Sequence, residues 1–224
     1  MRNPNRAIIW DMDGVLVDSG DLHYETWRDT LAEAFGLNVS REAFDATFGM
    51  DNFGVLKTLL GRSLSEAEAQ QLVERKEAAY RRRAAESVRP APAALDLVRT
   101  LKAQGWKQAV ATSSPRANLA LISRLLGLER WMDALVCFED VGRGKPDPAL
   151  FLLAAERMGV PPAYCVVIED APAGIAAARA AGMVSVAVTT THAASALAQA
   201  NRVVHSLSEI APQDLEALLN HGER

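Results

Sequence analysis

The stretch Ile8-Ile-Trp-Asp-Met-Asp-Gly-Val-Leu-Val-Asp-Ser19 decides the fold of this chain. Its apolar start, Ile8 to Trp10, is short and continuous, which is typical of a strand buried inside a parallel sheet. The run ends in Asp11 and Asp13, whose side chains share an orientation if the backbone stays extended, and the glycine that follows permits a sharp departure of the backbone. Ligands of open parallel sheets collect beyond the carboxyl ends of the strands, so the two acids stand where chemistry is expected.

Two carboxylates at one strand end can divide the work of phosphoryl transfer. One ionised Asp can attack phosphorus and bind a hard cation, and the other can carry a proton to or from the leaving oxygen. An isolated Asp-x-Asp is also common as a turn in which Asp caps the structure that follows. The longer string Asp-x-Asp-Gly-Val-Leu-x-Asp-Ser is far more specific than that tripeptide, and the rest of the chain tests it.

After Ser19 the pattern becomes helical and stays so up to a linker at Val88–Pro92. The last of these helical segments opens with Ser65-Glu-Ala-Glu68, a capping-box pattern. Several helices without an intervening strand indicate a separate helical unit, inserted directly after the acidic loop. The expected helices carry Tyr24 to Phe35, Phe44 to Phe48, Phe53 to Leu60, and Leu72 to Tyr80.

From Pro92 onward, helical segments that end at glycine alternate with short apolar strands. This alternation predicts an α/β fold with a doubly wound parallel sheet, to which the strand Ile8–Trp10 also belongs. The expected strands are Ala109–Ala111, Leu135–Phe138, Val166–Ile168, Val184–Val188 and, at an edge, Val203–Val204. The expected helices are Pro92–Gln104, Pro115–Leu126, Pro148–Met158, Ala173–Ala181 and Asp214–Leu219.

Polar residues follow the second strand of the expected sheet, at the edge where Asp11 lies. They read Thr112-Ser113-Ser114 and stand immediately before Pro115 at a helix start. Thr112 can donate its hydroxyl to a phosphate oxygen, and the free N–H groups of the helix attract the same anion. Ser114 is also suited to cap that helix, with Pro115 at its first position.

Charged residues follow the third and fourth strands. Lys145 stands in a loop bounded by glycine and proline, where it could neutralise Asp11 and a transferred phosphoryl group together, and a solvated loop lysine is the alternative. Glu169 and Asp170 end the fourth strand. Two acids facing Asp11 repel each other unless a cation lies among them, and Mg²⁺ suits such oxygen ligands. Plain helix capping is the alternative for this pair.

The composition is that of an ordinary soluble globular protein. The 224 residues include 28 acidic and 24 basic ones, a balance that does not indicate a nucleic-acid-binding protein. Cys137 and Cys165 lie in apolar runs, which favours buried reduced thiols over a disulfide or a metal pair. Residues 1–6 are not followed by the apolar segment of a signal peptide, and no apolar stretch is long enough for a membrane span, so we expect a cytoplasmic protein.

Together, the four polar strand ends resemble the four sequence motifs of the haloacid dehalogenase superfamily, in the branch that holds β-phosphoglucomutase and many sugar-phosphate phosphatases. The resemblance covers nearly the whole chain and is least specific in its last thirty or so residues. It implies a Rossmann-like catalytic core at residues 1–17 and 89–224. Residues 18–88 are then a mobile helical cap, which closes over the site to exclude water and to select the substrate.

The resemblance also implies a role for each polar strand end. Asp11 is the nucleophile that forms an aspartyl-phosphate, Asp13 is the general acid/base, and Thr112 and Lys145 hold the phosphoryl group. The implied ligands of Mg²⁺ are Asp11, the backbone carbonyl of Asp13, and Asp170, with Glu169 nearby or acting through water. The partner is a small phosphorylated metabolite, with neither nucleic acid nor membrane involved, and the protein is expected to be a monomer or a weak homodimer.

The cap residues bear on the choice between a phosphatase and a mutase. His23 and Trp27 match the family's His-x-x-x-Trp placement, and in the mutase the matching His is thought to couple cap closure to the acid/base Asp. A histidine on an amphipathic helix is otherwise usually a packing residue. Phe48 and Asn52 stand where β-phosphoglucomutase carries a Lys and an Arg, and a mutase needs such a second grip on a bisphosphate.

The loss of these two cations favours hydrolysis. We therefore expect an Mg²⁺-dependent phosphatase, a phosphoric monoester hydrolase, that acts on small sugar phosphates through an aspartyl-phosphate. The alternative is a β-phosphoglucomutase-type isomerase that interconverts sugar 1- and 6-phosphates. The expected substrate-binding residues are Ser113, Ser114, Arg116, His23 and Asn52.

Other polar residues are interpreted without a catalytic role. The basic residues of the last cap helix favour a solvated helix face, with an anion-binding patch as the alternative. They are Arg75, Lys76, Arg81, Arg82 and Arg83. His192, His205 and His221 lack metal-ligand spacing and are assigned no role.

Overall fold

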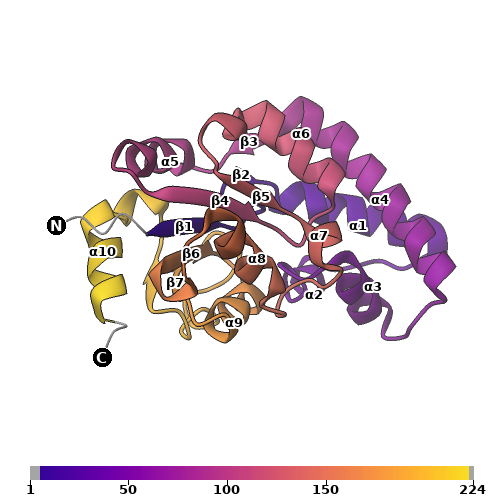
Figure 1. Cartoon of the computed structure of the whole chain (residues 1–224). Helices are drawn as coiled ribbons and strands as arrows, with labels where there is room; N and C mark the ends of the chain where they lie inside the picture. Colours follow the sequence, from indigo (N-terminus) through magenta and orange to yellow (C-terminus); the bar gives the residue numbers. More distant parts are fainter. Residues whose placement is uncertain (1–5, 222–224) are drawn as a thin grey trace.

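A parallel sheet forms the centre of the molecule in the computed structural model, which describes residues 6–221 (Figure 1). The ends of the expected core, residues 1–5 and 222–224, lie outside the described residues. In spatial order the strands are β5 (Ala134–Val136), β4 (Lys107–Ala111), β1 (Ala7–Trp10), β6 (Cys165–Glu169), β7 (Val184–Val188) and β8 (Arg202–Val204). The predicted class, a doubly wound parallel α/β sheet, is confirmed.

Alternation along each strand supplies two apolar faces to this sheet. In β1, Ile8 and Trp10 belong to one buried cluster, whereas Ala7 and Ile9 belong to another on the opposite face. The first cluster includes side chains of α5 (Ala94–Ala103), α6 (Arg116–Leu126) and α10 (Pro212–His221). The second includes side chains of α8 (Ala149–Met158) and α9 (Pro172–Ala180). With helices on both faces, β1 is fully buried at the middle of the sheet, between β4 and β6.

The four helices between Ser19 and Val88 bury an apolar cluster of their own. They lie at the end of the molecule remote from α10 (Figure 1). Their bounds are α1 (Gly20–Phe35), α2 (Arg41–Asp45), α3 (Asn52–Leu60) and α4 (Glu66–Ser87). The capping box expected at Ser65 is present, because the Ser65 hydroxyl accepts from the Glu68 N–H and the Glu68 carboxylate accepts from the Ser65 N–H. Phe48, expected on a helix with Phe44, instead follows α2 in a turn.

The chain enters and leaves these four helices through two short antiparallel strands, β2 (Val17–Asp18) and β3 (Arg89–Pro90). The sequence predicted only a linker at Val88–Pro92. Two-residue strands leave no periodic signal, and their pairing arises because the outgoing and returning segments lie side by side.

The third predicted strand is shorter than expected. It ends at Val136, and Phe138 instead begins the short helix α7 (Phe138–Val141). The Asp140 carboxylate accepts from both the N–H and the thiol of Cys137, which turns the apolar run into a helix start. The hydrogen bonds to Asp140 therefore end β5 early, although the apolar residues Cys137 and Phe138 alone would favour a longer strand.

Both cysteines are free and buried, as expected. Burial raises the pKa of the thiols of Cys137 and Cys165 to about 12, so both are poor nucleophiles. Among the helices at residues 6–221, none combines the length and apolarity that a membrane span requires.

Candidate active site

Four polar segments meet beyond the carboxyl edge of the sheet. Asp11 follows β1, Thr112 follows β4, Glu169 ends β6 and Asp170 follows it. Lys145 comes from the loop between α7 and α8, and its ammonium lies 2.5 Å from Asp11 Oδ1 and 2.6 Å from Glu169 Oε1. The ladder between β1 and β6 extends into the site, because the Asp11 N–H donates to the Ile168 carbonyl at 3.0 Å. Pairing of β1 with β6 brings Asp11 next to Ile168, and the loop that carries Lys145 reaches the same edge of the sheet.

Lys145 is not a solvated loop lysine, because its side chain is only 1% exposed. Burial lowers its pKa, but the carboxylates of Asp11 and Glu169 more than offset this effect, so the pKa lies above its usual value. Burial raises the pKa of Asp11 to about 7, with Lys145 acting in the opposite direction and Glu169 adding to the rise. The buried ammonium therefore compensates only part of the negative charge around Asp11.

Asp11, Glu169 and Asp170 each offer a carboxylate oxygen, and these atoms lie within 4.8 Å of one another. Three carboxylates and the Lys145 ammonium leave a formal charge of −2 in a buried space, the charge that a divalent cation neutralises. Asp170 Oδ1 is buried and has no hydrogen-bond partner among residues 6–221, whereas Oδ2 accepts from the Thr191 hydroxyl at 2.5 Å. An unsatisfied carboxylate oxygen inside an acidic cluster fits a hard cation with oxygen ligands.

Glu169 differs from its neighbours because its oxygens are already used. Oε1 accepts from Lys145, and Oε2 accepts from the N–H groups of Asp170 and Ala171. Glu169 does not cap α9, whose N-cap is Ala171 without a side-chain cap, and its side chain lies in the acidic cluster instead. Asp11 and Asp170 remain the carboxylates free to face a cation directly.

Asp13 lies in different surroundings. Its Oδ1 accepts from the Ser19 hydroxyl at 2.6 Å and faces His23 Nε2 at 3.1 Å, and its Oδ2 accepts from the Ser114 hydroxyl at 2.7 Å. Burial acts to raise the pKa of Asp13, but His23 and the two hydroxyls outweigh it, so the pKa lies below its usual range. The two acids of the Asp-x-Asp motif therefore have different surroundings and opposite pKa shifts. Asp11 lies among charged groups, and Asp13 lies among hydrogen-bond donors.

Gly14 allows these groups to approach each other. Its φ is +82°, and a Cβ at this position would lie 2.0 Å from Asp170 Oδ2. Any side chain here would both strain the backbone and displace Asp170. The sharp departure expected after the two acids thus makes room for Asp170, which directly follows β6.

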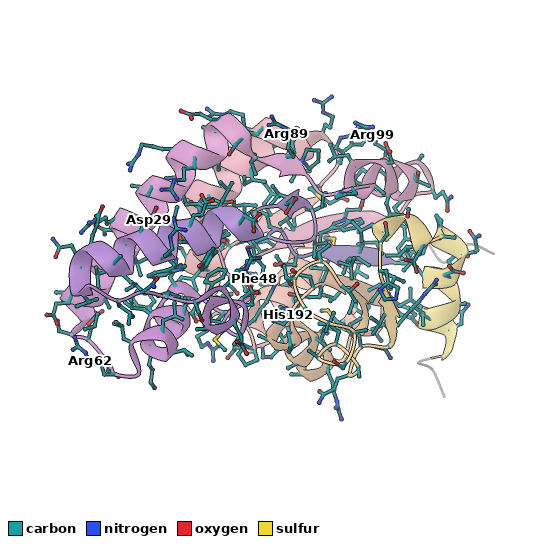
Figure 2. The ribbon with its side chains drawn as sticks, turned by 180° about the vertical axis from the view of Figure 1, so that it is seen from behind. Asp29, Phe48, Arg62, Arg89, Arg99 and His192 are labelled. Atoms are coloured by element: carbon teal, nitrogen blue, oxygen red, sulfur yellow. The ribbon has the colours of Figure 1, made fainter. Side chains whose placement is uncertain are left out.

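A cavity of about 50 Å³ opens beside Asp11 and Asp13, a few times the ~10–15 Å³ that one water needs. Core and helical residues both line it, and Phe48 lies near the junction between these two parts (Figure 2). A second hollow, of about 250 Å³, shares Asn52 and Ser113 with the first. The lining of the first is Asp11, Asp13, His23, Trp27, Phe44, Thr47, Phe48, Gly49, Met50, Asn52, Val55, Lys76, Thr112, Ser113 and Ser114.

The residues after β4 are brought to this cavity, but Ser114 does not cap α6 as expected. The N-cap of α6 is Pro115, with no side-chain cap, and the Ser114 hydroxyl instead donates to Asp13. Thr112 lines the cavity while its hydroxyl accepts from the Ser114 N–H at 3.0 Å. The Ser113 hydroxyl accepts from the Lys145 N–H at 3.2 Å and so ties two loops together. Capping was the wrong interpretation of Ser114 because the carboxylate of Asp13 lies within its reach.

The expected substrate-binding residues divide into two groups. His23 and Asn52, from α1 and α3, line the cavity with Ser113 and Ser114. Arg116 does not line either hollow. Its guanidinium pairs with Asp140 at 3.0 Å and its side chain is 58% exposed, because α7 places two acids against the start of α6. Glu139 and Asp140 therefore hold Arg116 away from the cavity.

Comparison with known proteins now identifies the family. Residues 5–182 match the family described as haloacid dehalogenase-like hydrolase. The chain belongs to the haloacid dehalogenase-like hydrolases. Fructose-1-phosphate phosphatase YqaB of Escherichia coli (strain K12) is 36% identical over 81% of this chain and 95% of its own length. β-Phosphoglucomutase of Bacillus subtilis (strain 168) is 33% identical over 82% of this chain and 83% of its own length.

A solved structure shares the fold of this haloacid dehalogenase-like hydrolase nearly end to end. The crystal structure of a haloacid dehalogenase (HAD) hydrolase, family IA, variant 3, from Entamoeba histolytica has a TM-score of 0.87 at 26% identity. The match covers 96% of this chain and 99% of the other. The family resemblance expected from the four sequence motifs is confirmed.

Sequence reasoning missed the charged cavity residue Lys76 of this haloacid dehalogenase-like hydrolase. Lys76, interpreted as part of a solvated basic face, is 1% exposed and lines the cavity. Its ammonium lies 2.8 Å from His23 Nδ1 and 2.8 Å from Glu77 Oε1. A signal was present: Val73, Lys76 and Tyr80 recur at helical spacing on the buried face of α4. Lys76 was grouped with its basic neighbours in sequence rather than with its apolar neighbours on the helix.

Three further residues contact the site without a strong local signal. The Thr191 hydroxyl donates to Asp170, and His192, to which no role was assigned, has its Nδ1 3.1 Å from the Asp170 carbonyl (Figure 2). Tyr80 donates its hydroxyl to Asp13 at 3.3 Å and stacks on His23 with ring centroids 4.1 Å apart. These contacts join segments distant in sequence, so residue spacing could not reveal them.

Proposed function

We propose that this protein is an Mg²⁺-dependent phosphatase that releases phosphate from small phosphorylated metabolites, with sugar phosphates as the substrate class. The observation that carries this proposal is the contrast between the two acids of one motif. Asp11 lies within a charged cluster with Lys145, whereas Asp13 lies among donors from Ser19, Ser114 and His23. Such a division suits one nucleophile and one proton carrier.

In the first step, a carboxylate oxygen of Asp11 attacks phosphorus and the bond between phosphorus and the leaving oxygen breaks. Asp13 gives a proton to that oxygen, and an aspartyl-phosphate remains on Asp11. The phosphoryl group brings negative charge next to Asp13, which raises the pKa of Asp13 and lets it carry this proton. In the second step Asp13 takes a proton from water, the water oxygen bonds to phosphorus, and Asp11 is released with inorganic phosphate.

Two further core residues are proposed to hold the phosphoryl group. Lys145 supplies a buried positive charge, and Thr112 supplies a hydroxyl at the cavity wall. Asp11 and Asp170, with the Asp13 carbonyl and with Glu169 nearby, would hold Mg²⁺, which when bound neutralises charge on the transferring group. The unsatisfied Oδ1 of Asp170 supports this assignment.

The helical side of the cavity supports hydrolysis over a mutase reaction. Phe48 packs edge-on against His23 and Phe44, with ring centroids 6.1 and 5.9 Å apart, so an apolar ring occupies the position of an anion grip. Asn52 donates to Glu77 at 2.8 Å. Lys76, the lysine among the lining residues, already has Glu77 and His23 as partners. These residues offer no free pair of cations for a second phosphate.

The helices α1–α4 fit the role of a cap. We assign residues 18–88 to this cap and residues 1–17 and 89–224 to the catalytic core, with β2 and β3 as the connection. The relatives include a fructose-1-phosphate phosphatase and a β-phosphoglucomutase, which makes a small phosphorylated sugar the first substrate to test. A cytoplasmic location and a monomer or weak homodimer stay predictions from the sequence.

The test is phosphate release from fructose 1-phosphate and β-glucose 1-phosphate with and without Mg²⁺. We expect Mg²⁺-dependent release that the Asp11→Asn variant loses, by at least about a thousandfold. The control is Asp96→Asn on α5, where the side chain is exposed and pairs with Arg99 at the surface. This variant should keep wild-type rates.

Two results would overturn the proposal. One is an Asp11→Asn variant as active as the wild type. The other is conversion of β-glucose 1-phosphate to glucose 6-phosphate, with catalytic bisphosphate added and little free phosphate formed, since that reaction is the mutase alternative.

A further inference from the structure

A buried carboxylate of the cap has no role in the function proposed above. Glu77, on α4, is 3% exposed. Its Oε1 accepts from the Lys76 ammonium and from the Asn52 amide, each at 2.8 Å. Burial acts to raise its pKa, but Lys76 outweighs this effect and the pKa is lowered, so the group is a carboxylate. Both of these donors line the cavity beside Asp11.

The other oxygen of Glu77 reaches across to the core. Oε2 accepts from the side-chain amide of Asn118 on α6 at 2.5 Å, and Asn118 is fully buried. The amide oxygen of Asn118 accepts in turn from the Arg81 guanidinium at 3.1 Å. Arg81 therefore fixes which end of the Asn118 amide faces Glu77. The carboxylate has its full set of donors only while α4 rests against α6.

Lys76 links Glu77 to Asp13, the proposed acid/base residue, through His23. Its ammonium can only donate, so His23 Nδ1 must accept, and the single ring proton is then on Nε2. Nε2 faces Asp13 Oδ1 at 3.1 Å and donates to it. A continuous chain of contacts thus runs from Asp13 of the core through His23, Lys76 and Glu77 of the cap, and back to Asn118 of the core.

We propose that Glu77 is a positioning residue that, when completed by Asn118, holds Lys76 and thereby the His23 tautomer that faces Asp13. This role rests on the proposed phosphatase function. When position 77 no longer turns an acceptor oxygen to Lys76, the buried ammonium loses this partner and turns from His23, because an unpaired buried charge is costly. His23 is then free to take either tautomer, and its donation to Asp13 is lost in part of the molecules.

A swap of donor and acceptor tests this link. In Glu77→Gln, Arg81 keeps the amide donor of Asn118 turned to position 77, so the introduced amide gives its oxygen to Asn118 and turns its NH₂ to Lys76. In Asn118→Asp, two carboxylates meet. We expect each single variant to lower kcat on a sugar phosphate on the order of ten- to a hundredfold, the effect of losing a hydrogen bond to a charged group. In the double variant Glu77→Gln/Asn118→Asp the NH₂ at position 77 donates to the new carboxylate, which still accepts from Arg81, and the amide oxygen faces Lys76 again. We therefore expect kcat to recover to within about fivefold of wild type.

Glu86→Gln is the matched control, because Glu86 is exposed on the same helix and this change should leave kcat unaltered. A Glu77→Gln variant with the kcat of wild type overturns the proposal. So does a double variant whose loss equals the product of the two single losses, since that result denies any coupling between the two residues.

A second readout needs no substrate. Imidazole ¹⁵N chemical shifts report the tautomer of His23 in the free protein, and we expect a proton on Nε2 in the wild type and in the double variant, but a mixture in Glu77→Gln. The same single tautomer in all three proteins overturns the link to His23. If the wild type releases no phosphate, the proposed function fails, while these spectra still decide whether Glu77 controls His23.

Discussion

At the scale of single residues, Asp170 shows how closely the contacts of one side chain are specified. One carboxylate oxygen accepts from Thr191, and the other is buried without a partner. Gly14 lies so close that a single added carbon would contact Oδ2. The Thr191 hydroxyl therefore holds one oxygen of Asp170, a member of the acidic cluster, and leaves the other oxygen without a partner.

We predict that Thr191→Val weakens Mg²⁺ binding about tenfold, because a partner that orients a metal ligand typically contributes that much or more. Isothermal titration calorimetry of Mg²⁺ into the free protein measures the affinity. Thr189→Val is the control, since the Thr189 hydroxyl contacts His205 in an exposed position. Equal affinities in wild type and Thr191→Val would contradict the assigned role.

The sequence predicted which residues lie at the site better than it predicted the partners of their side chains. The convergence of Asp11, Asp13 and Lys145 was predicted from their positions after strands, because a parallel sheet brings strand ends to one edge. The partner of Ser114 and the burial of Lys76 did not follow, since both depend on residues from other segments. Spacing along one segment carries no information about which side chain of another segment lies opposite.

At the scale of elements, the loop between α2 and α3 rests directly on the core. Gly49 has a φ of +89°, and a Cβ there would lie 2.5 Å from the Cβ of Ala171, which follows Asp170. A Cβ on Gly144, next to Lys145, would lie 2.6 Å from the Cβ of Asp51. Gly49 of the helical part and Gly144 of the core thus let the α2–α3 loop and the core loops approach each other closely.

We predict that Gly49→Ala lowers kcat/KM on a sugar phosphate at least about tenfold, since the added methyl holds the loop away from Ala171 and loosens the site. Steady-state kinetics measures this effect. Gly61→Ala separates contact from backbone strain, because Gly61 has a similar φ of +65° and nothing within 4 Å of the added carbon. It should cost about 1 kcal/mol of unfolding free energy and leave kcat/KM unchanged. Equal kinetic losses in the two variants would show that strain alone is responsible.

Among elements, the helices were predicted more accurately than the short strands. Glycines at helix ends and the capping box at Ser65 are local signals, and the helices α3, α4 and α8 formed where they indicated. β2 and β3 were missed, and β5 was predicted too long. Two- and three-residue strands are specified by their partners rather than by their own residues.

At the scale of the whole molecule, the site lies where the apolar clusters of the core meet the cluster of α1–α4. Burial on all sides makes its charges costly. Burial raises the pKa of Asp11 to about 7 and also raises the pKa of Asp170, both far from the 3.8 expected of an exposed Asp. Folding without a cation therefore places ionised carboxylates in an unfavourable medium.

The sign of the pH effect on stability follows from this shift. Because the folded pKa of Asp11 lies above its unfolded value, its contribution to stability is full below pH 3.8 and is lost as the pH rises through 7. Mg²⁺ competes with the protons on these carboxylates. We predict that Mg²⁺ raises the melting temperature by several degrees at pH 7.5 and much less at pH 5.

Thermal melts with Mg²⁺ or with a chelator, at both pH values, measure this difference. Asp11→Asn removes the titrating group and should have a smaller difference between the two pH values. A stabilisation by Mg²⁺ that is as large at pH 5 as at pH 7.5 would contradict a cation bound among these acids.

The sequence by itself determined the parallel α/β class, the inserted helices, the family resemblance and the acids that crowd the site. These are encoded in local patterns: apolar runs, helical spacing, caps and polar strand ends. Only the tertiary structure decided that Lys76 and Glu77 are buried at the cavity, that Ser114 serves Asp13, and that Arg116 turns to Asp140. The physical reason is that the direction, charge balance and hydrogen-bond partners of a side chain are set by segments distant in sequence, which meet only when the chain has folded.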